Sequence, residues 1–199
     1  GQMMIATRHG NFAVKKGDKL AGTRIIPLVI EEEKMEAAKR AAAEATGGCP
    51  ILELKPFLHK KAGIVTTGNE VFYGRIQDTF TPVIRGKLSE FDTEVIDHVT
   101  WNDDDTKVTA SILDMIQKGA DVVVCTGGMS VDPDDKTPLA IRNTGADIVS
   151  YGAPVLPGAM FLLAYYQVRD GENPRTVAIM GLPGCVMYAK RTIFDLVLP

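Results

Sequence analysis

The chain has 199 residues, of which 45% are hydrophobic and 24% are charged, and its formal net charge is −3. These values are ordinary for a globular protein, and the length allows one sizeable domain with a small appendage. The chain carries no large basic block, so we do not expect nucleic acid as its main partner. It also lacks an apolar stretch near the ~20 residues that span a bilayer, so we do not expect a membrane partner.

Three cysteines, Cys49, Cys125 and Cys185, lie far apart in the sequence and show no metal-binding spacing. An odd number of unclustered cysteines favours reduced thiols and a cytoplasmic location. The first ten residues do not form a signal peptide pattern. The chain stops directly after an apolar run, so we expect it to be part of a longer protein.

The first 60 residues predict a small α+β unit, residues 1–60. Residues 25–30 are rich in β-forming side chains and follow several turn residues, which predicts a strand. Residues 31–48, EEEKMEAAKRAAAEATGG, predict a helix because they combine an acidic first turn, an Ala-rich body and two terminal glycines. Residues 50–57, PILELKPF, alternate in polarity and predict a short strand.

From residue 61 onward strands and helices alternate, which predicts a three-layer α/β/α domain over residues 61–199 with a mostly parallel sheet. Residues 121–126, DVVVCT, form the continuous apolar strand that is expected when both faces of a sheet are covered. The other expected elements are strands at residues 61–67 and 93–100, helices at 78–91 and 104–119, and a last hairpin that turns at residues 170–174.

Ligands of an open parallel sheet bind beyond the carboxyl ends of its strands, and loops of unusual composition follow the predicted strands here. The first loop is TTGNEVFYGRIQD, residues 66–78. Gly68 allows a tight turn, Thr67 offers a hydroxyl and Glu70 a carboxylate. Asp78 lies where a helix begins, and we favour a role as helix cap over a role as ligand.

The second loop places Asp103, Asp104 and Asp105 directly before a helix. Capping of the orphan amides explains one of these carboxylates. It does not explain three, because they repel one another unless a cation or solvent relieves the repulsion. Asp103 and Asp104 are therefore candidates for a metal or ligand pocket.

The third loop is TGGMSVDPDDKTP, residues 126–138. Gly127 and Gly128 allow backbone N–H groups to approach a phosphate, and Ser130 adds a hydroxyl donor. Asp132, Asp134 and Asp135 would repel that phosphate unless Mg²⁺ lies between them, and hard oxygen ligands suit Mg²⁺. The loop therefore predicts a metal-bridged phosphate, and it is not a Walker loop because the Gly-Lys-Ser/Thr ending is absent.

Two Pro-Gly corners form the fourth feature, at Pro157-Gly158 and at Leu182-Pro183-Gly184. Such steps make rigid corners whose amides can face a ligand. The three histidines, His9, His59 and His98, are scattered, and no pattern in the sequence places them near these loops.

These loops together resemble the molybdopterin-binding domain family of molybdenum cofactor biosynthesis, over about residues 61–199. TGNEVFYGRIQD resembles the Thr-Gly-Asp/Asn-Glu opening of that family, and TGGMSVDPDDKTP resembles its Thr-Gly-Gly loop. LPGAM and GLPGC resemble the segments that close its pocket. The chain departs from the family at Phe80, where an Asn is usual, and at Cys185, where Asn or a small polar residue is usual.

The resemblance implies a role for each loop. Asp135 would act in adenylyl or molybdate transfer with Mg²⁺, with Asp134 as a second metal ligand and ATP or AMP as a further cofactor. Asp103, or Asp104 beside it, matches the acidic position ahead of the second helix in that family, and the resemblance implies a catalytic role for Asp103. The implied ligand-binding residues are Thr67, Gly68, Glu70, Asp104, Thr126, Gly127, Gly128, Met129, Ser130, Pro157, Gly158, Leu182, Pro183 and Gly184.

Three functions remain open at this point. The first is a transferase that acts on molybdopterin. The second is a non-catalytic carrier or sensor of molybdopterin, which the changes at Phe80 and Cys185 favour. The third is a nucleotide pyrophosphate hydrolase, because Asp134-Asp135-Lys136-Thr137 also resembles the competence-damage-inducible protein family. Relatives are often oligomers, so we expect a homo-oligomer.

Overall fold

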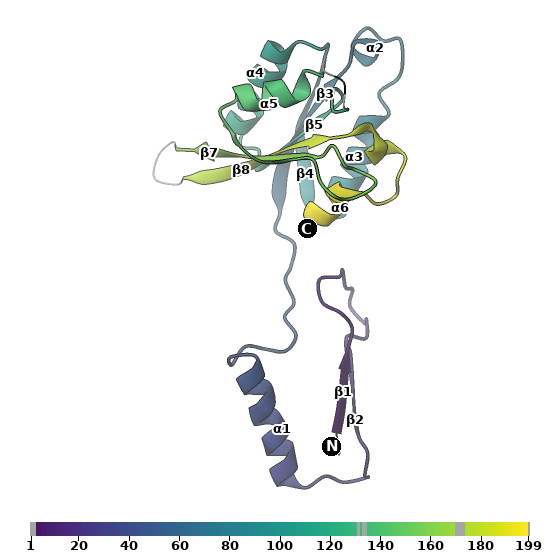
Figure 1. Cartoon of the computed structure of the whole chain (residues 1–199), viewed down its shortest axis with the longest axis vertical. Helices are drawn as coiled ribbons and strands as arrows, with labels where there is room; N and C mark the ends of the chain where they lie inside the picture. Colours follow the sequence, from purple (N-terminus) through teal and green to yellow (C-terminus); the bar gives the residue numbers. More distant parts are fainter. Residues whose placement is uncertain (1–2, 131, 133–134, 170–173, 199) are drawn as a thin grey trace. The chain divides into compact units, whose positions relative to one another are not determined.

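The computed structural model of the chain describes residues 3–130, 132, 135–169 and 174–198. The chain divides into two compact units, Gly1–Lys55 and Pro56–Pro199, which we call the N-terminal unit and the α/β unit. Figure 1 shows the elements of both units in sequence colours. Among the helices of the described residues, none is long and apolar enough to cross a membrane.

The N-terminal unit contains one antiparallel hairpin and one helix. Strand β1 (Met3–Thr7) pairs with β2 (Ala21–Ile25), and α1 (Glu32–Ala45) follows. The helix confirms the prediction for residues 31–48. It begins with acidic residues in its first turn, and at its end the amide of Gly48 donates to the carbonyl of Ala43 at 2.8 Å.

Two strand predictions for this unit are wrong. The strand expected at residues 25–30 ends at Ile25, where β2 stops. Pro27 lacks an N–H group, so the apolar run after Ile25 cannot continue the hydrogen-bonded ladder. Residues 50–57 form no strand, since Pro50 and Pro56 remove a donor near each end of the segment.

The α/β unit confirms the predicted alternation of strands and helices. Its elements in chain order are β3 (Lys60–Thr67), α2 (Asn69–Phe72), α3 (Phe80–Ser89), β4 (Thr93–Trp101), α4 (Asp105–Gln117), β5 (Val122–Thr126), α5 (Thr137–Asn143), β6 (Asp147–Tyr151), β7 (Leu162–Val168), β8 (Arg175–Leu182), the 3₁₀ turn η1 (Gly184–Met187) and α6 (Ile193–Val197).

One six-stranded sheet organises the unit, with the strand order β4-β3-β5-β8-β7-β6. The four strands β4, β3, β5 and β8 run parallel, whereas β7 runs antiparallel to both of its neighbours. The sheet is therefore mostly parallel, as predicted. Strands β7 and β8 flank the expected hairpin turn, and its residues 170–173 lie outside the described part of the chain.

Helices cover both faces of this sheet, which confirms the three-layer prediction (Figure 1). On one face, Val108 and Ile112 of α4 and Ile141 of α5 pack against the sheet in one core cluster. On the other face, Ile84 of α3 and Phe194 of α6 belong to a second cluster. Because both faces of the sheet are buried, the central strands carry apolar side chains at consecutive positions and not only at every second position.

Candidate functional site

The carboxyl ends of three neighbouring strands lie at one edge of the sheet. In the parallel register, Thr66 of β3 pairs with Thr126 of β5, and Thr126 pairs with Leu182 of β8. The chain leaves these strands at Thr67, Gly127 and Pro183. The first and third predicted loops and the Leu182-Pro183-Gly184 corner therefore begin side by side.

The Thr-Gly-Gly loop is clamped between the end of β3 and the start of α5. The hydroxyl of Thr67 lies 3.1 Å from that of Thr137, and it donates to the carbonyl of Thr126 at 3.3 Å. The Thr137 hydroxyl donates to the carbonyl of Gly127 at 2.8 Å. Thr137 was not among the predicted site residues, because its position in a Thr-Pro helix start gives no sign of these contacts.

Gly127 is required at its position for two reasons. Its φ is +84°, and a Cβ atom placed on it would lie 2.0 Å from the carbonyl oxygen of Thr67. No side chain can occupy that space without moving the backbone of β3. Gly128 has φ +50°, and a Cβ atom there would lie 3.0 Å from the Thr137 hydroxyl.

Met129 turns its side chain into the core. It is 3% exposed, and its sulfur and methyl group fill the space beside Gly181, where a Cβ atom would lie 2.6 Å from the methyl carbon. Met129 was predicted as a ligand-binding residue. With the side chain buried, its main chain is the part that can meet a ligand.

Asp135 braces the loop that contains it. Its Oδ2 accepts hydrogen bonds from the amide of Ser130 at 2.5 Å and from the Ser130 hydroxyl at 2.8 Å. The amide of Asp135 donates to the carbonyl of Asp132 at 3.1 Å. Asp134, the second predicted metal ligand, lies outside the described residues.

Tyr151 at the end of β6 lies near this carboxylate and was not among the predicted site residues. Burial raises the pKa of the Tyr151 phenol, and the negative charge of Asp135 raises it further. Its side chain remains 46% exposed. A tyrosine at a strand end has no local sequence signature, so only the sheet order reveals this neighbour.

The three consecutive aspartates have three different roles. The Asp103 carboxylate accepts from the Asn69 amide group at 2.7 Å, which ties the second loop to the first. Asp104 caps α4 by accepting a hydrogen bond from the amide of Lys107, and this bond lowers the pKa of Asp104. Asp105 accepts from Asn143 of α5 at 3.3 Å. The prediction that capping accounts for one of the three is confirmed.

The remaining residues of the first loop lie at the end of β3. The amide of Gly68 donates to the carbonyl of Trp101 at 3.1 Å, and Gly68 has φ +143°. Glu70 is exposed in the first turn of α2. Asp78 accepts from the amides of Phe80 and Thr81, at 2.9 and 3.1 Å, so its predicted role as a helix cap is confirmed.

The two Pro-Gly corners are held by different neighbours. A Cβ atom on Gly158 would lie 2.4 Å from the Ile193 side chain, and the Ile193 amide donates to the carbonyl of Pro157 at 3.3 Å. That corner packs against α6. Leu182 and Pro183 are buried, whereas Gly184 is exposed and begins η1 near Phe80.

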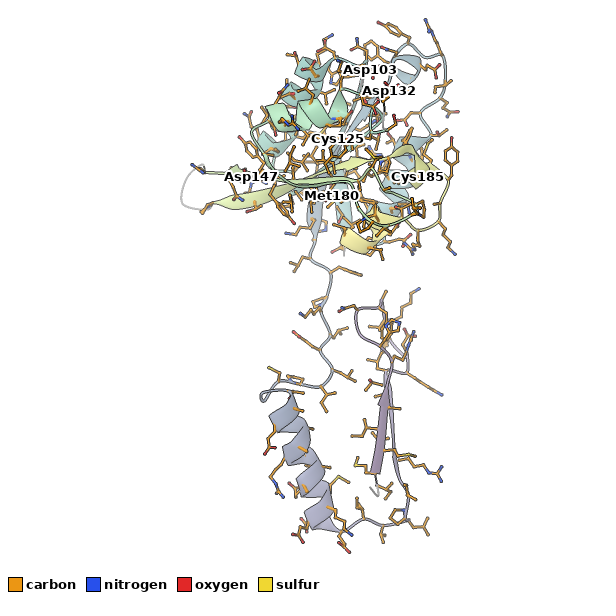
Figure 2. The ribbon with its side chains drawn as sticks, in the orientation of Figure 1. Asp103, Cys125, Asp132, Asp147, Met180 and Cys185 are labelled. Carbon is orange, nitrogen blue, oxygen red and sulfur yellow. The ribbon has the colours of Figure 1, made fainter. Side chains whose placement is uncertain are left out.

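Figure 2 shows how these groups are distributed over the unit. Asp103 and Asp132 both lie at the top of the α/β unit, whereas Asp147 lies toward its left side. Among the residues that the structure describes, no three His, Cys, Asp or Glu side chains are grouped to hold a metal ion. The three cysteines carry free thiols, and burial raises the pKa of Cys125 to about 12.

The comparison with protein families decides the identity of the larger unit. Residues 63–199 match the family described as "Probable molybdopterin binding domain". The chain belongs to this family. The resemblance that the four loops predicted is therefore confirmed.

Two kinds of relatives share parts of this chain. A CinA-like protein of Mycobacterium tuberculosis (strain H37Ra) is 34% identical over 90 residues, which make up 45% of this chain and 21% of that protein. A CinA-like protein of Mycobacterium avium (strain 104) is 33% identical over the same length. The chain thus spans less than two thirds of the length of these relatives.

Solved structures show the same fold at low sequence identity. The tungsten cofactor synthesizing protein MoaB of Pyrococcus furiosus is 23% identical, with a TM-score of 0.50 over 67% of this chain and 86% of that chain. The molybdopterin biosynthesis enzyme MoaB of Thermus thermophilus is also 23% identical, with a TM-score of 0.52 over 70% of this chain and 90% of that chain. The chain shares the architecture of these proteins.

Proposed function

We propose that the α/β unit binds molybdopterin at the carboxyl ends of β3, β5 and β8 and serves molybdenum cofactor biosynthesis. The observation that carries this proposal is the Thr-Gly-Gly loop, whose glycine at position 127 is packed directly on the end of β3. Backbone amides of such a loop are suited to a phosphate group. Membership of the molybdopterin-binding family supports the choice of ligand.

In this proposal the loop residues hold the phosphate and the corners hold the pterin. Gly127, Gly128 and Ser130 would cradle the phosphate, while Thr67 fixes the loop from the end of β3. The exposed corner at Gly184 would face the pterin, together with Pro157 and Gly158, which pack against Ile193 of α6.

Mg²⁺ fits the residues that are present. Mg²⁺ is usually bound by one or two carboxylates together with phosphate oxygens. Asp135 is such a carboxylate, it is partly exposed, and it lies beside the Ser130 hydroxyl of the proposed phosphate loop. Asp135 would hold the ion, which would neutralise negative charge between the carboxylate and the phosphate.

The finer proposal is that the unit transfers an adenylyl group from ATP or a molybdate to bound molybdopterin. Most of the acceleration in such reactions comes from positioning and from electrostatic stabilisation. Asp135 and Asp103 are the carboxylates that we assign to this step. Each is held by a neighbour, Ser130 or Asn69, at 2.8 and 2.7 Å.

Binding of molybdopterin, followed by its pterin fluorescence with and without Mg²⁺ and ATP, tests the proposal. We expect saturable binding that Mg²⁺ strengthens, and an adenylylated product with ATP if the unit is a transferase. Binding without a product would identify a carrier or sensor. Absence of binding at every Mg²⁺ concentration would overturn the proposal.

The Asp135→Asn variant sharpens this experiment, with Asp147→Asn as its control. Asp147 is an exposed carboxylate at the start of β6. We expect Asp135→Asn to remove the Mg²⁺ dependence while the fold stays intact, and Asp147→Asn to behave like the natural chain. Equal Mg²⁺ dependence in both variants would contradict the assignment of Asp135.

A second candidate function is hydrolysis of a nucleotide pyrophosphate. The observation that favours it is the 34% identity with the CinA-like proteins over 90 residues. Release of AMP from ADP-ribose in the presence of Mg²⁺ would support it. No release under conditions in which molybdopterin binds would exclude it in favour of the first proposal.

We also expect the protein to form a homo-oligomer in the cytoplasm. Light scattering after size-exclusion chromatography measures the oligomeric state. A monomer at every concentration would contradict the expectation.

A further inference from the structure

A group of hydroxyls, three of them buried and that of Thr100 partly exposed, lies directly beneath the proposed phosphate loop, on the sheet face that α3 and α6 cover. Thr100, Thr66 and Thr126 are neighbours on β4, β3 and β5, and Thr81 joins them from the first turn of α3. We call these four residues the hydroxyl row. The Thr126 hydroxyl donates to that of Thr66 at 3.3 Å.

His98 of β4 is the centre of this row. Its Nε2 lies 2.9 Å from the hydroxyl oxygen of Thr81, 3.2 Å from that of Thr66 and 3.5 Å from that of Thr100. It also lies 3.6 Å from Oδ2 of Asp78, the carboxylate that caps α3. The sequence pattern did not place His98 near the strand-end loops, and the structure corrects this, because strand pairing brings β4 beside β3.

The hydrogen bonds of the row have a definite direction. The Thr81 hydroxyl donates its one hydrogen to Oδ2 of Asp78 at 2.5 Å. Thr81 can then only accept from His98, so Nε2 of His98 carries a hydrogen. A neutral imidazole with its proton on Nε2 can therefore donate to the Thr81 hydroxyl, which in turn donates to Asp78, the cap of α3.

The row acts on the residues of the candidate site through the backbone. Thr66 directly precedes Thr67, and Thr126 directly precedes Gly127. Thr67 and Gly127 are the residues whose close packing fixes the Thr-Gly-Gly loop. The hydroxyl row thus holds the same two strand ends from the opposite face of the sheet.

We propose that neutral His98 is a positioning residue for the Thr-Gly-Gly loop, and that a second proton on its ring loosens the loop and weakens binding of the phosphate-bearing ligand. The binding part rests on the proposed function; the loosening of the loop does not. Among the described residues that we assign to the phosphate loop, His98 is hydrogen-bonded to none, and it acts through Thr66 and Thr81.

The surroundings of His98 keep it neutral at neutral pH. Burial lowers the pKa of His98, and the positive charge of Arg85 on α3 lowers it further, while the carboxylates of Asp78 and Asp97 oppose these effects. A second proton would place a positive charge 3.6 Å from Asp78. Asp78 would then be drawn from the donors of α3 toward the imidazolium, and Thr81 and Thr66 would follow.

Amide hydrogen exchange and ring titration by NMR test the loosening without any ligand. We expect the opening of the Thr67 and Gly127 amides, corrected for intrinsic exchange, to increase by about fivefold or more as the pH falls below the ordinary histidine pKa of about 6.5 and the His98 ring takes up its second proton. The increase should follow the titration of the His98 ring. Unchanged opening while that ring titrates would overturn the proposal.

Two variants separate positioning from a general effect of acid. In His98→Gln the side-chain amide can still donate to Thr81 but cannot titrate, so we expect a firm loop with no pH dependence. His59→Gln is the control, because His59 is exposed, lies 3.5 Å from Asp92, and should leave the pH dependence as it is. Persistent pH dependence in His98→Gln would contradict the proposal, and if that variant does not fold, the titration of the natural chain still decides.

Molybdopterin affinity over the same pH range provides the second test. We expect a loss of about fivefold or more on acidification in the natural chain and in His59→Gln, and none in His98→Gln. If molybdopterin does not bind at any pH, the proposed function fails, whereas the exchange measurement still accepts or rejects the role of His98.

Discussion

The N-terminal unit and the α/β unit both contain strands and helices, but they differ in how many of their side chains are buried. Among the described residues of the N-terminal unit none is buried, and Leu28 and Val29 are 100% and 80% exposed. In the α/β unit, two core clusters cover both faces of the sheet. An isolated hairpin or a 14-residue helix is marginal in water. The contrast indicates that local sequence patterns select helices and strands, whereas burial of apolar side chains stabilises them.

The largest effect that we expect comes from the buried ion pair of the α/β unit. Lys87 donates to both carboxylate oxygens of Asp195 at 2.7 Å, and both side chains are nearly inaccessible. Lys87→Met removes the buried partner of the Asp195 charge and leaves the exposed Arg191 beside it at 3.1 Å, so we expect a loss of about 3–5 kcal/mol in the free energy of unfolding. Urea unfolding measures this loss.

The same pair gives a pH dependence with a definite sign. Burial acts to raise the pKa of Asp195, but bonds from Lys87, the Thr192 amide and Arg191 outweigh it and hold that pKa below the ordinary value. The Asp195 carboxylate contributes fully to the stability of the fold at pH values above the ordinary aspartate pKa, about 3.9. This contribution is lost as the pH falls through the lowered pKa of Asp195. The difference in stability between Lys87→Met and the natural chain should therefore shrink under acid. A stability difference that does not shrink toward low pH would contradict this account.

The second effect is the loss of a core side chain. Ile112 of α4 is 0% exposed, and Ile112→Ala should lower the free energy of unfolding by about 2–5 kcal/mol. Leu28→Ala in the N-terminal unit is the matched comparison, and we expect a change within about 0.5 kcal/mol there. Equal losses at both positions would show that Leu28 is covered in solution and would break the contrast between the units.

The third effect separates two glycines. Gly127→Ala places a Cβ atom against the Thr67 carbonyl and puts a side chain at φ +84°. We therefore expect the free energy of unfolding to fall by about 1–3 kcal/mol and molybdopterin binding to be lost. Gly22→Ala in β2 meets no atom within 4 Å. It should leave both stability and binding unchanged in thermal unfolding and fluorescence titration. Normal binding by a folded Gly127→Ala protein would contradict the geometry of the candidate site.

The smallest effect belongs to surface ion pairs. Lys39 and Glu36 of α1 approach to 2.7 Å, but their side chains are 66% and 46% exposed. Water and salt screen such a pair, so Glu36→Gln should change the free energy of unfolding by about 0.5 kcal/mol or less. A loss comparable to that of Lys87→Met would show that α1 is buried against a partner.

The sequence alone determined the elements whose signals are local. The acidic start and glycine end of α1, the cap Asp78, a cap among the three aspartates 103–105, and the apolar run of β5 are all short-range patterns, and the structure confirms each of them. The family followed from four motifs that each occupy one loop. The alternating pattern fails at residues 50–57, where Pro50 and Pro56 each lack the N–H group that a strand needs.

Tertiary structure alone decided which residues meet. Thr137 reaches Thr67 across 70 positions, and His98 reaches Thr66 across 32, because parallel strands bring their ends together only after helices have crossed between them. Met129 illustrates the same limit, since its place in a loop motif pointed to a ligand while its side chain fills the core beside Gly181. Contacts between distant strands depend on sheet order, and sheet order is a property of the whole chain.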